Sequence, residues 1–482
     1  MAHLKIGWAE GNLTPEQPVL IAGQFHARVS EGVADPITAT ALVLDVGNDH
    51  AVMVSCDFVC IADALRDAVR SRVATLCPGL DPMKIILNAT HTHTGPEVRT
   101  PMSKSGHASK NVGVDLDAMP VEEYVDFAVE RIAGTIADAW SSRMPGEVAF
   151  GQDYAVIGHN RRWVDRDGAS TMYGNTDTPE FCNIEGYEDH SVGVLATRNH
   201  EGILTGLIVN VPCPSQVSEQ SFFLSADYWY ETREELRRRL GDGLFVLVQS
   251  SAAGDQSPHL IFGKRAEERM LSLGGRTLRQ EIAQRIANAV EKTLSCIGSE
   301  FNSVPVLKHH IERVDLPMTV LTESDAQTAK SEAERLHGQV QREKLKLETS
   351  PESRQQKRWY LTVTDAYRRM NWYRAVVERF EAQKRLSTFP VEMHVLRLGE
   401  AAFATTPFEY YLDFGIYIKA RSKATQTFVV QLAGQGTYVP SRRSVSGGGY
   451  GAIPASNPVG PEGGRQLAEI TTAFVEQLWS VG

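Results

Sequence analysis

Between residues 39 and 90 the chain alternates between strand-like and helix-like segments. Residues 39–47 and 50–59 are rich in valine and are separated by an Asn-Asp turn signal. Residues 62–76 carry apolar side chains at helical spacing, and residues 83–90 form a third apolar run that is short enough for a buried strand. This strand–helix–strand order predicts an α/β unit whose strands are neighbours in one sheet.

The alternation continues in the middle of the chain. Residues 190–199 and 203–213 predict a β-hairpin, and residues 228–240 predict an amphipathic helix. Residues 244–258 predict a buried strand that runs into a Gly-Asp turn, and residues 275–294 predict a long helix. The fold class is therefore α/β with a mixed sheet.

Residues 323–385 differ from their surroundings because they are highly charged and helical throughout, with a break near Pro351. Two antiparallel helices joined at that proline are the simplest structure for such a segment. Acidic side chains are interleaved with the basic ones, which favours a solvated surface over a nucleic-acid site. We expect a helical hairpin at 323–385, inserted into a single domain that spans residues 1–482.

The last hundred residues return to alternating elements. A hairpin is predicted at 391–407, a helix from 408–422, a buried strand at 426–434 and an amphipathic helix at 465–479. The glycine-rich segment 434–450 lacks the Lys-Ser/Thr of a phosphate loop and is expected to form a flexible lid.

Composition excludes several classes of protein. The content of hydrophobic residues (42%) and charged residues (22%) is that of a globular domain. The net charge of −10 gives no electrostatic support to nucleic-acid binding. No apolar run approaches the ~18 residues that cross a bilayer, and the N-terminus lacks the apolar stretch of a secretory signal, so we expect no transmembrane segment and a cytoplasmic location. The six cysteines form no Cys-x-x-Cys pair, which favours free thiols.

The most informative stretch for chemistry runs from Asn88 to Pro96, with the sequence NATHTHTGP. Side chains two residues apart on an extended chain project to the same side, so His91 and His93 can face one centre. Imidazole is a common ligand of catalytic zinc, and the pair leaves the end of a buried strand, where sites are often built. An amidohydrolase barrel also carries such a pair, but its eight strand–helix repeats are missing here.

Over most of its length the sequence resembles the catalytic domain of neutral (non-lysosomal) ceramidases. The most specific match is ATHTHTGP, and a second is the Gly-Asp-x-Ser-Pro element at residues 254–258. The resemblance implies a ceramidase-like, metal-dependent hydrolase domain with zinc as its metal. It also implies that His91 is a zinc ligand and that His93 is a neighbouring catalytic residue.

Further site residues are implied by the same resemblance. The family's Asn-Arg pair matches Asn160-Arg161, which makes Arg161 a substrate-orienting candidate. Its carboxylate ligand matches Glu409. Its two functional tyrosines, twelve residues apart, match Tyr438 as a zinc ligand and Tyr450 as a catalytic residue.

One position departs from the family pattern. The family's second histidine ligand precedes a proline, and Cys213-Pro214 stands at the corresponding place in this chain. A thiolate is an excellent zinc ligand, although its negative charge lowers the Lewis acidity of the metal. We expect a metal held by His91, Cys213, Glu409 and Tyr438; a different metal, a nucleophilic Cys213 and a site without metal remain open.

In the expected reaction, a water activated by the metal cleaves an amide or related bond of a small polar, lipid or glycoconjugate substrate. Two other functions stay open. The aromatic residues of segment 163–175 would suit a carbohydrate-active enzyme that cleaves glycosidic bonds. The second alternative is a non-catalytic binding protein whose metal site has decayed. Assembly into a homo-oligomer also stays open. Ser225-Ala226-Asp227 is interpreted as the N-cap of the following helix.

Overall fold

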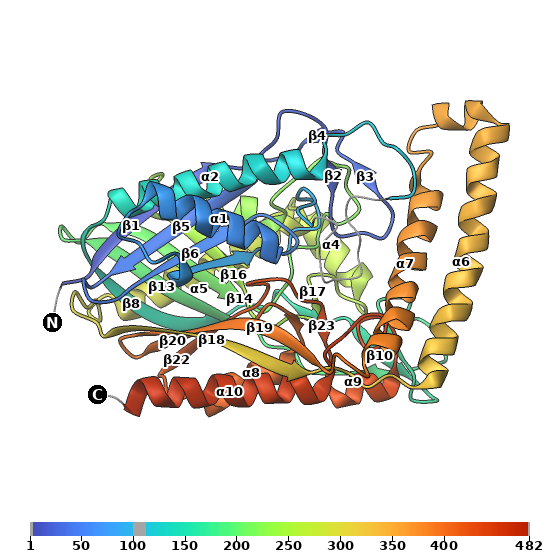
Figure 1. Cartoon of the computed structure of the whole chain (residues 1–482). Helices are drawn as coiled ribbons and strands as arrows, with labels where there is room; N and C mark the ends of the chain where they lie inside the picture. Colours follow the sequence, from blue (N-terminus) through green and yellow to red (C-terminus); the bar gives the residue numbers. More distant parts are fainter. Residues whose placement is uncertain (1–2, 100–111, 481–482) are drawn as a thin grey trace.

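The computed structural model describes residues 3–99 and 112–480, and these form four stacked layers (Figure 1). The first of the two inner layers is an eight-stranded mixed sheet. Most neighbouring pairs are antiparallel, whereas β6 with β7 and β14 with β16 are parallel. In spatial order the strands are β16 (Phe245–Ser250), β14 (Leu204–Val211), β13 (Ser191–Asn199), β8 (Met144–Tyr154), β1 (Lys5–Asn12), β5 (Thr38–Asp45), β6 (His50–Cys56) and β7 (Ile85–Ala89).

The second inner layer is a four-stranded sheet in the order β18 (Leu307–Pro317), β19 (Thr388–Leu398), β20 (Ala401–Thr405) and β22 (Gln426–Val430). An apolar cluster with side chains from both sheets, including Leu42, Ile208, Leu396 and Phe428, fills the space between them. The other sheet covers the inner face of each sheet and helices cover its outer face, which explains why strands such as β5 and β20 are apolar along nearly their whole length.

Helices cover the outer face of each sheet. Those on the large sheet are α1 (Asp63–Leu76), α2 (Val121–Ser141), α3 (Tyr228–Leu240) and α5 (Leu278–Ile297). Those on the small sheet are α8 (Leu412–Arg421) and α10 (Pro461–Ser480). Each presents an apolar stripe inward, as α1 does with Leu65, Val69 and Val73. The α/β class expected from the sequence is confirmed.

Two long helices project beyond these layers at the right of Figure 1. They are α6 (Glu323–Thr349) and α7 (Leu361–Ala382), which pack against each other and are joined through a short 3-10 turn, Pro351–Gln355. The pair interrupts the chain between β18 and β19. A Thr322–Asp325 capping box begins α6.

The remaining elements are short. They are β2 (Leu20–Ile21), β3 (Arg28–Val29), β4 (Gly32–Val33), β9 (His159–Asn160), β10 (Arg162–Asp165), β11 (Ser170–Met172), β12 (Phe181–Ile184), β15 (Phe223–Leu224), β17 (Gln256–Ser257), β21 (Glu409–Tyr410), β23 (Tyr438–Val439), α4 (Lys264–Gly274), α9 (Arg442–Gly447) and the 3-10 turn Pro82–Lys84. Segment 434–450, expected to be a flexible lid, contains β23 and α9, because β23 pairs with β21 and Ser441 caps α9. In the described ranges no helix is long and apolar enough to cross a membrane.

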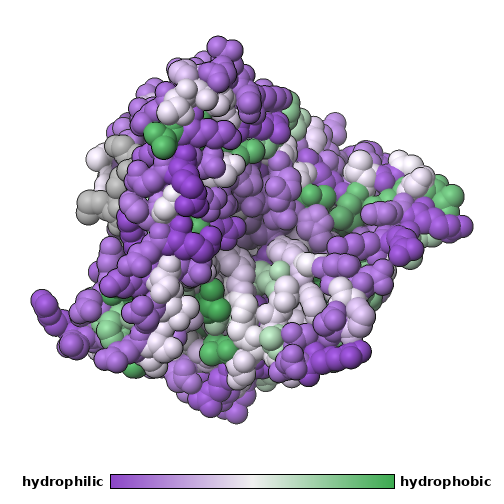
Figure 2. All heavy atoms as spheres, turned by 90° about the vertical axis from the view of Figure 1, so that its right-hand side faces the viewer, coloured by the Kyte–Doolittle hydropathy of each residue, from purple (hydrophilic) through white to green (hydrophobic). Residues whose placement is uncertain are grey.

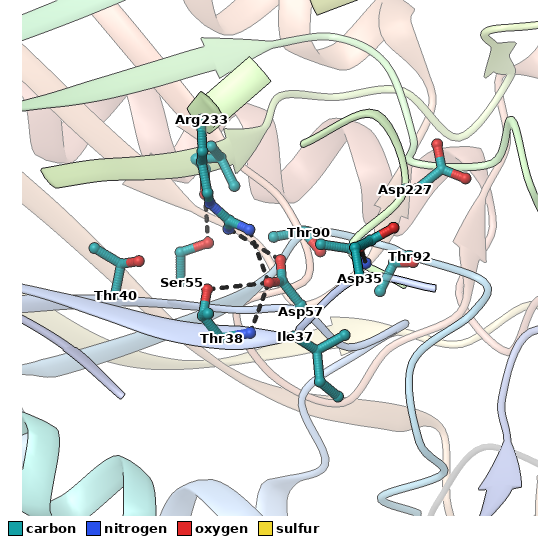
Figure 3. Close-up of polar contacts among 12 residues, drawn as sticks. Asp35, Ile37, Thr38, Thr40, Ser55, Asp57, Thr90, Thr92, Asp227 and Arg233 are labelled. Carbon is teal, nitrogen blue, oxygen red and sulfur yellow. Dashed lines mark hydrogen bonds and ion pairs between the residues drawn. The ribbon is translucent and has the colours of Figure 1, made fainter. Parts of the chain in front are cut away.

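A buried ion pair ties the large sheet to its helical cover (Figure 3). Asp57, just after β6, accepts hydrogen bonds from both terminal nitrogens of Arg233 on α3, at 2.8 and 3.0 Å. The same carboxylate accepts from the backbone N–H of Thr38 at 2.8 Å. Both charged side chains are almost fully buried (0% and 4% exposed). The pair therefore fixes the segment that leaves β6.

Candidate active site

His91 lies two residues beyond the end of β7, in a left-handed backbone conformation (φ 63°) that is unusual for a residue other than glycine. Its Nδ1–H donates a hydrogen bond to the carbonyl of Val59 at 2.7 Å. This bond leaves the Nε2 lone pair free to face Glu409, whose Oε2 is 3.4 Å away. Local backbone strain and the Val59 contact together aim the imidazole into the site.

His93 lies beside His91, with 3.3 Å between their Nε2 atoms. The side-chain amide of Gln216 donates to His93 Nε2 at 2.7 Å. Burial lowers the pKa of His93 well below its ordinary value, and the nearby His91 adds to the effect, so the ring is neutral. Gly23 (φ +98°) closes over the ring, and a β-carbon at that position would lie 2.6 Å from His93 Cγ.

Glu409 and Tyr438 are brought together by the parallel pairing of β21 with β23, in which they are direct partners. Burial raises the pKa of Glu409, but His91 and Arg161 outweigh it, so that the pKa lies below its ordinary value. Burial raises the pKa of Tyr438 well above its usual range, and the Glu409 carboxylate beside it acts in the same direction. The phenol is therefore protonated and hydrogen-bonded to a charged carboxylate.

Arg161 is fully buried and follows β9. Its two terminal nitrogens donate to Tyr438 Oη (3.2 Å), the Gly254 carbonyl (2.9 Å), Tyr173 Oη (2.8 Å) and Gln216 Oε1 (3.1 Å). Because these donors are bonded to four oxygen atoms, the guanidinium is held rigidly beside Tyr173 and Tyr438. It supplies a fixed positive charge to the site.

An aromatic wall completes the pocket. The Tyr450 ring lies 5.4 Å from that of Tyr438, 6.1 Å from that of Phe25 and 5.9 Å from that of Trp372 on α7. Burial raises the pKa of Tyr450 to about 12. The cavity between these rings, the two histidines and Glu409 has a volume of about 80 Å³. The helical hairpin thus contributes directly to the site through Trp372.

The structure thus brings six of the seven predicted site residues together, namely His91, His93, Arg161, Glu409, Tyr438 and Tyr450. Cys213 is not among the residues that line the cavity. It is fully buried in the apolar cluster beneath α3, with its thiol 3.5 Å from the Pro214 carbonyl. Burial raises the pKa of the thiol far above its ordinary value. Its role as a ligand stays a prediction.

The donors in the pocket can be compared with the geometry of zinc. A tetrahedral zinc ion with bonds of about 2.0–2.1 Å places its ligand atoms about 3.4 Å apart. The distance from His91 Nε2 to Glu409 Oε2, 3.4 Å, matches that value. Within residues 3–99 and 112–480, no three His, Cys, Asp or Glu side chains are arranged to hold a metal ion. A third protein donor to this pair would have to be of another type, and the phenol of Tyr438, which is hydrogen-bonded to Glu409, is the candidate.

Among the site residues that were not predicted from the sequence are Arg99 and Trp372, which line the pocket, and Gln216, which contacts His93. Gln216 carried a usable signal, because it is a polar residue shortly after the buried strand β14, as His91 is after β7. Arg99 forms a bidentate ion pair with the buried Glu97, at 2.8 and 2.6 Å. Trp372 gave no local signal, since its spacing on α7 is that of an ordinary packed helix.

We expect Gln216→Leu to lower kcat/KM by about 10- to 100-fold, the range for losing a partner that orients site residues. Gln216 donates to His93 and accepts from Arg161, so its replacement leaves polar groups unpaired on both sides. Steady-state kinetics on an amide substrate measures the effect. The control is Gln152→Leu on the exposed part of β8, which should leave the kinetics unchanged. Equal behaviour of the two variants would contradict a role for Gln216.

No protein-family model matches this sequence, and no curated protein matches it. Solved structures do match the fold. A structure of ceramidase complexed with C2 aligns over 100% of this chain and 76% of its own, with a TM-score of 0.69 and 15% sequence identity. Neutral ceramidase from Pseudomonas aeruginosa aligns over 99% of this chain and 75% of its own, with a TM-score of 0.69 and 15% identity. The chain has the fold of these ceramidase structures, as the sequence resemblance implied.

Proposed function

We propose that this protein is a divergent, zinc-dependent, ceramidase-like hydrolase that cleaves an amide bond. The observation that carries the proposal is the meeting of His91, Glu409 and Tyr438 in one pocket, with His93 beside them and Arg161 behind. The fold similarity to neutral ceramidases supports it independently of these side chains. His91, Glu409 and Tyr438 would hold the metal.

Zinc bound there would polarise the substrate carbonyl and lower the pKa of a water molecule. The protein's own groups carry out the remaining steps. His93 Nε2, which accepts from the Gln216 amide, would exchange that hydrogen bond for one from the attacking water and take its proton as the oxygen bonds to the carbonyl carbon. The Tyr450 hydroxyl stabilises the oxyanion that develops. His93 then returns its proton to the nitrogen as the C–N bond breaks, which yields a carboxylic acid and an amine.

The size of the pocket limits how much of a substrate it encloses. A volume of about 80 Å³ is small beside the roughly 300–1,000 Å³ of pockets that enclose drug-sized ligands. A substrate with long chains would therefore place its amide in the cavity and leave most of each chain outside it. An N-acyl amino alcohol with a lipid chain fits this arrangement, and we take a short-chain N-acyl sphingosine as the test substrate.

Metal content tests the proposal directly. Elemental analysis of the purified chain should give about one zinc per chain, and the zinc should be lost in His91→Ala and Glu409→Gln because each removes a donor. His200→Ala, an exposed histidine in the β13–β14 turn, is the control and should retain zinc. Cys213→Ser should also retain it if three donors suffice, whereas loss would place Cys213 in the ligand set. A folded wild-type chain that takes up no metal would contradict the proposal.

A further inference from the structure

Helix α4 (Lys264–Gly274) buries none of its side chains. Helices of this length are marginal in water and depend on packing of an apolar face. Glycines in the left-handed conformation stand at both ends, Gly263 (φ +68°) and Gly275 (φ +61°). The chain thus keeps a short helix on its surface in which only Glu267 and Leu271 are even half-buried.

The two faces of α4 differ in chemistry. Lys264, Glu267, Glu268 and Leu271 line a groove of about 470 Å³ between the helix and the rest of the molecule. The acidic side chains of the helix therefore lie on the side of the groove, with Glu267 half-buried and Glu268 exposed. Residues three or four apart share one face of a helix. The face opposite the groove carries Arg265, Arg269, Met270 and Leu273.

The outward face is both apolar and basic. Met270 is 61% exposed and Leu273 is 66% exposed, and Phe262 just before the helix is 51% exposed. Arg265, with a side chain 94% exposed, lies 3.7 Å from the carboxylate of Asp177, which is 88% exposed, and such surface pairs contribute little. Figure 2 shows hydrophobic side chains on the lobe at the right of the view. This is the side of the molecule that is distant from the viewer in Figure 1, and α4 lies there.

The groove behind α4 adjoins the candidate active site. Its lining includes Tyr173, whose hydroxyl accepts from Arg161, and Glu219, whose carboxylate is 3.8 Å from His93 Nδ1. The groove between α4 and the rest of the molecule therefore shares neighbours with the catalytic pocket.

We infer that α4 is a membrane-docking helix that lies in the interface of an anionic lipid bilayer. Exposed Phe, Met and Leu beside arginines form the pattern of interfacial helices, in which the apolar side chains enter the headgroup region and the cations contact anionic lipids. The net charge of −10 does not oppose this docking, because charges beyond about 10 Å are screened at physiological salt. The inference goes beyond the proposed function and does not depend on metal or catalysis.

Vesicle binding tests the inference. The full chain should co-sediment with vesicles of phosphatidylcholine containing about a third phosphatidylserine, and bind pure phosphatidylcholine more weakly. The double variant Arg265→Gln/Arg269→Gln should bind the anionic vesicles about 30-fold more weakly. Phe262→Ser/Met270→Ser/Leu273→Ser should bind at least about tenfold more weakly, because apolar burial is lost.

Matched controls separate docking from other effects. Met144→Ser/Ile203→Ser removes equally exposed apolar side chains (56% and 58%) from β8 and the β13–β14 turn, and should leave vesicle binding unchanged. Hydrolysis of a water-soluble substrate should be unchanged in every α4 variant, so failure of docking is distinguishable from failure of the proposed function. The inference is overturned if the wild-type chain does not bind vesicles, if both sets of variants bind equally, or if light scattering shows a dimer that the α4 variants dissociate.

Discussion

Glu409→Gln should lower turnover more than about a hundredfold. Replacing a residue that only orients a metal ligand already lowers activity or metal affinity by about 10- to 100-fold. Glu409 is itself a proposed ligand, so its replacement should cost more. The substitution keeps the size of the side chain but removes the charge that faces His91 Nε2 at 3.4 Å. It also replaces the carboxylate that accepts from the phenol of Tyr438 by a neutral amide. Steady-state and single-turnover kinetics on the N-acyl sphingosine measure the loss.

The matched control is Glu476→Gln on the exposed side of α10, which should retain wild-type turnover. Circular dichroism should report the same helix content for both variants, since Glu409 belongs to a strand of only two residues. Turnover of Glu409→Gln within a few-fold of wild type would remove the carboxylate from the proposed chemistry.

Asp57→Ala should destabilise the whole fold, lowering the free energy of unfolding by about 3–5 kcal/mol. It leaves the Arg233 guanidinium buried without its carboxylate, and it removes the acceptor of the Thr38 N–H. Equilibrium unfolding in urea measures the change. Activity should fall as well, because Asp57 fixes the segment whose Val59 carbonyl orients His91.

The double variant Asp57→Ala/Arg233→Met distinguishes an ion-pair effect from a general loss of packing. Removing both charges leaves no unpaired buried ion, so the double variant should be markedly more stable than Asp57→Ala alone. A double variant that loses the sum of the two single effects would show that the pair is not coupled. Figure 3 shows why we expect coupling, because the two side chains face each other directly.

Much of the fold could be predicted because its elements carry strong local patterns. The apolar spacing of residues 228–240 predicts α3 with its bounds, and Asp227, within the predicted cap, accepts from the Tyr228 N–H at the start of that helix. Strand β1 was not predicted, because small and polar residues in KIGWAEGN break the apolar run. Helix α2 was also missed, although its buried residues have clear helical spacing, so this was an error of interpretation.

Local sequence could likewise predict some residues of the candidate site and not others. Local sequence located His91 and His93, because they follow a buried strand. Glu409 and Tyr438 came only from the family resemblance, since the pairing of β21 with β23 rests on two residues in each strand and has no local signature. The position of Cys213 could not be predicted, because sequence does not determine whether a thiol after a buried strand faces the pocket or the core.

The most direct test of the account is hydrolysis of a short-chain N-acyl sphingosine by the full chain, before and after removal of metal. We predict release of the fatty acid, its loss after treatment with a zinc chelator, and its return when zinc is added to the wild-type chain but not to His91→Ala. A folded wild-type chain that leaves this amide intact, or cleaves it equally well without metal and without His91, would contradict the account.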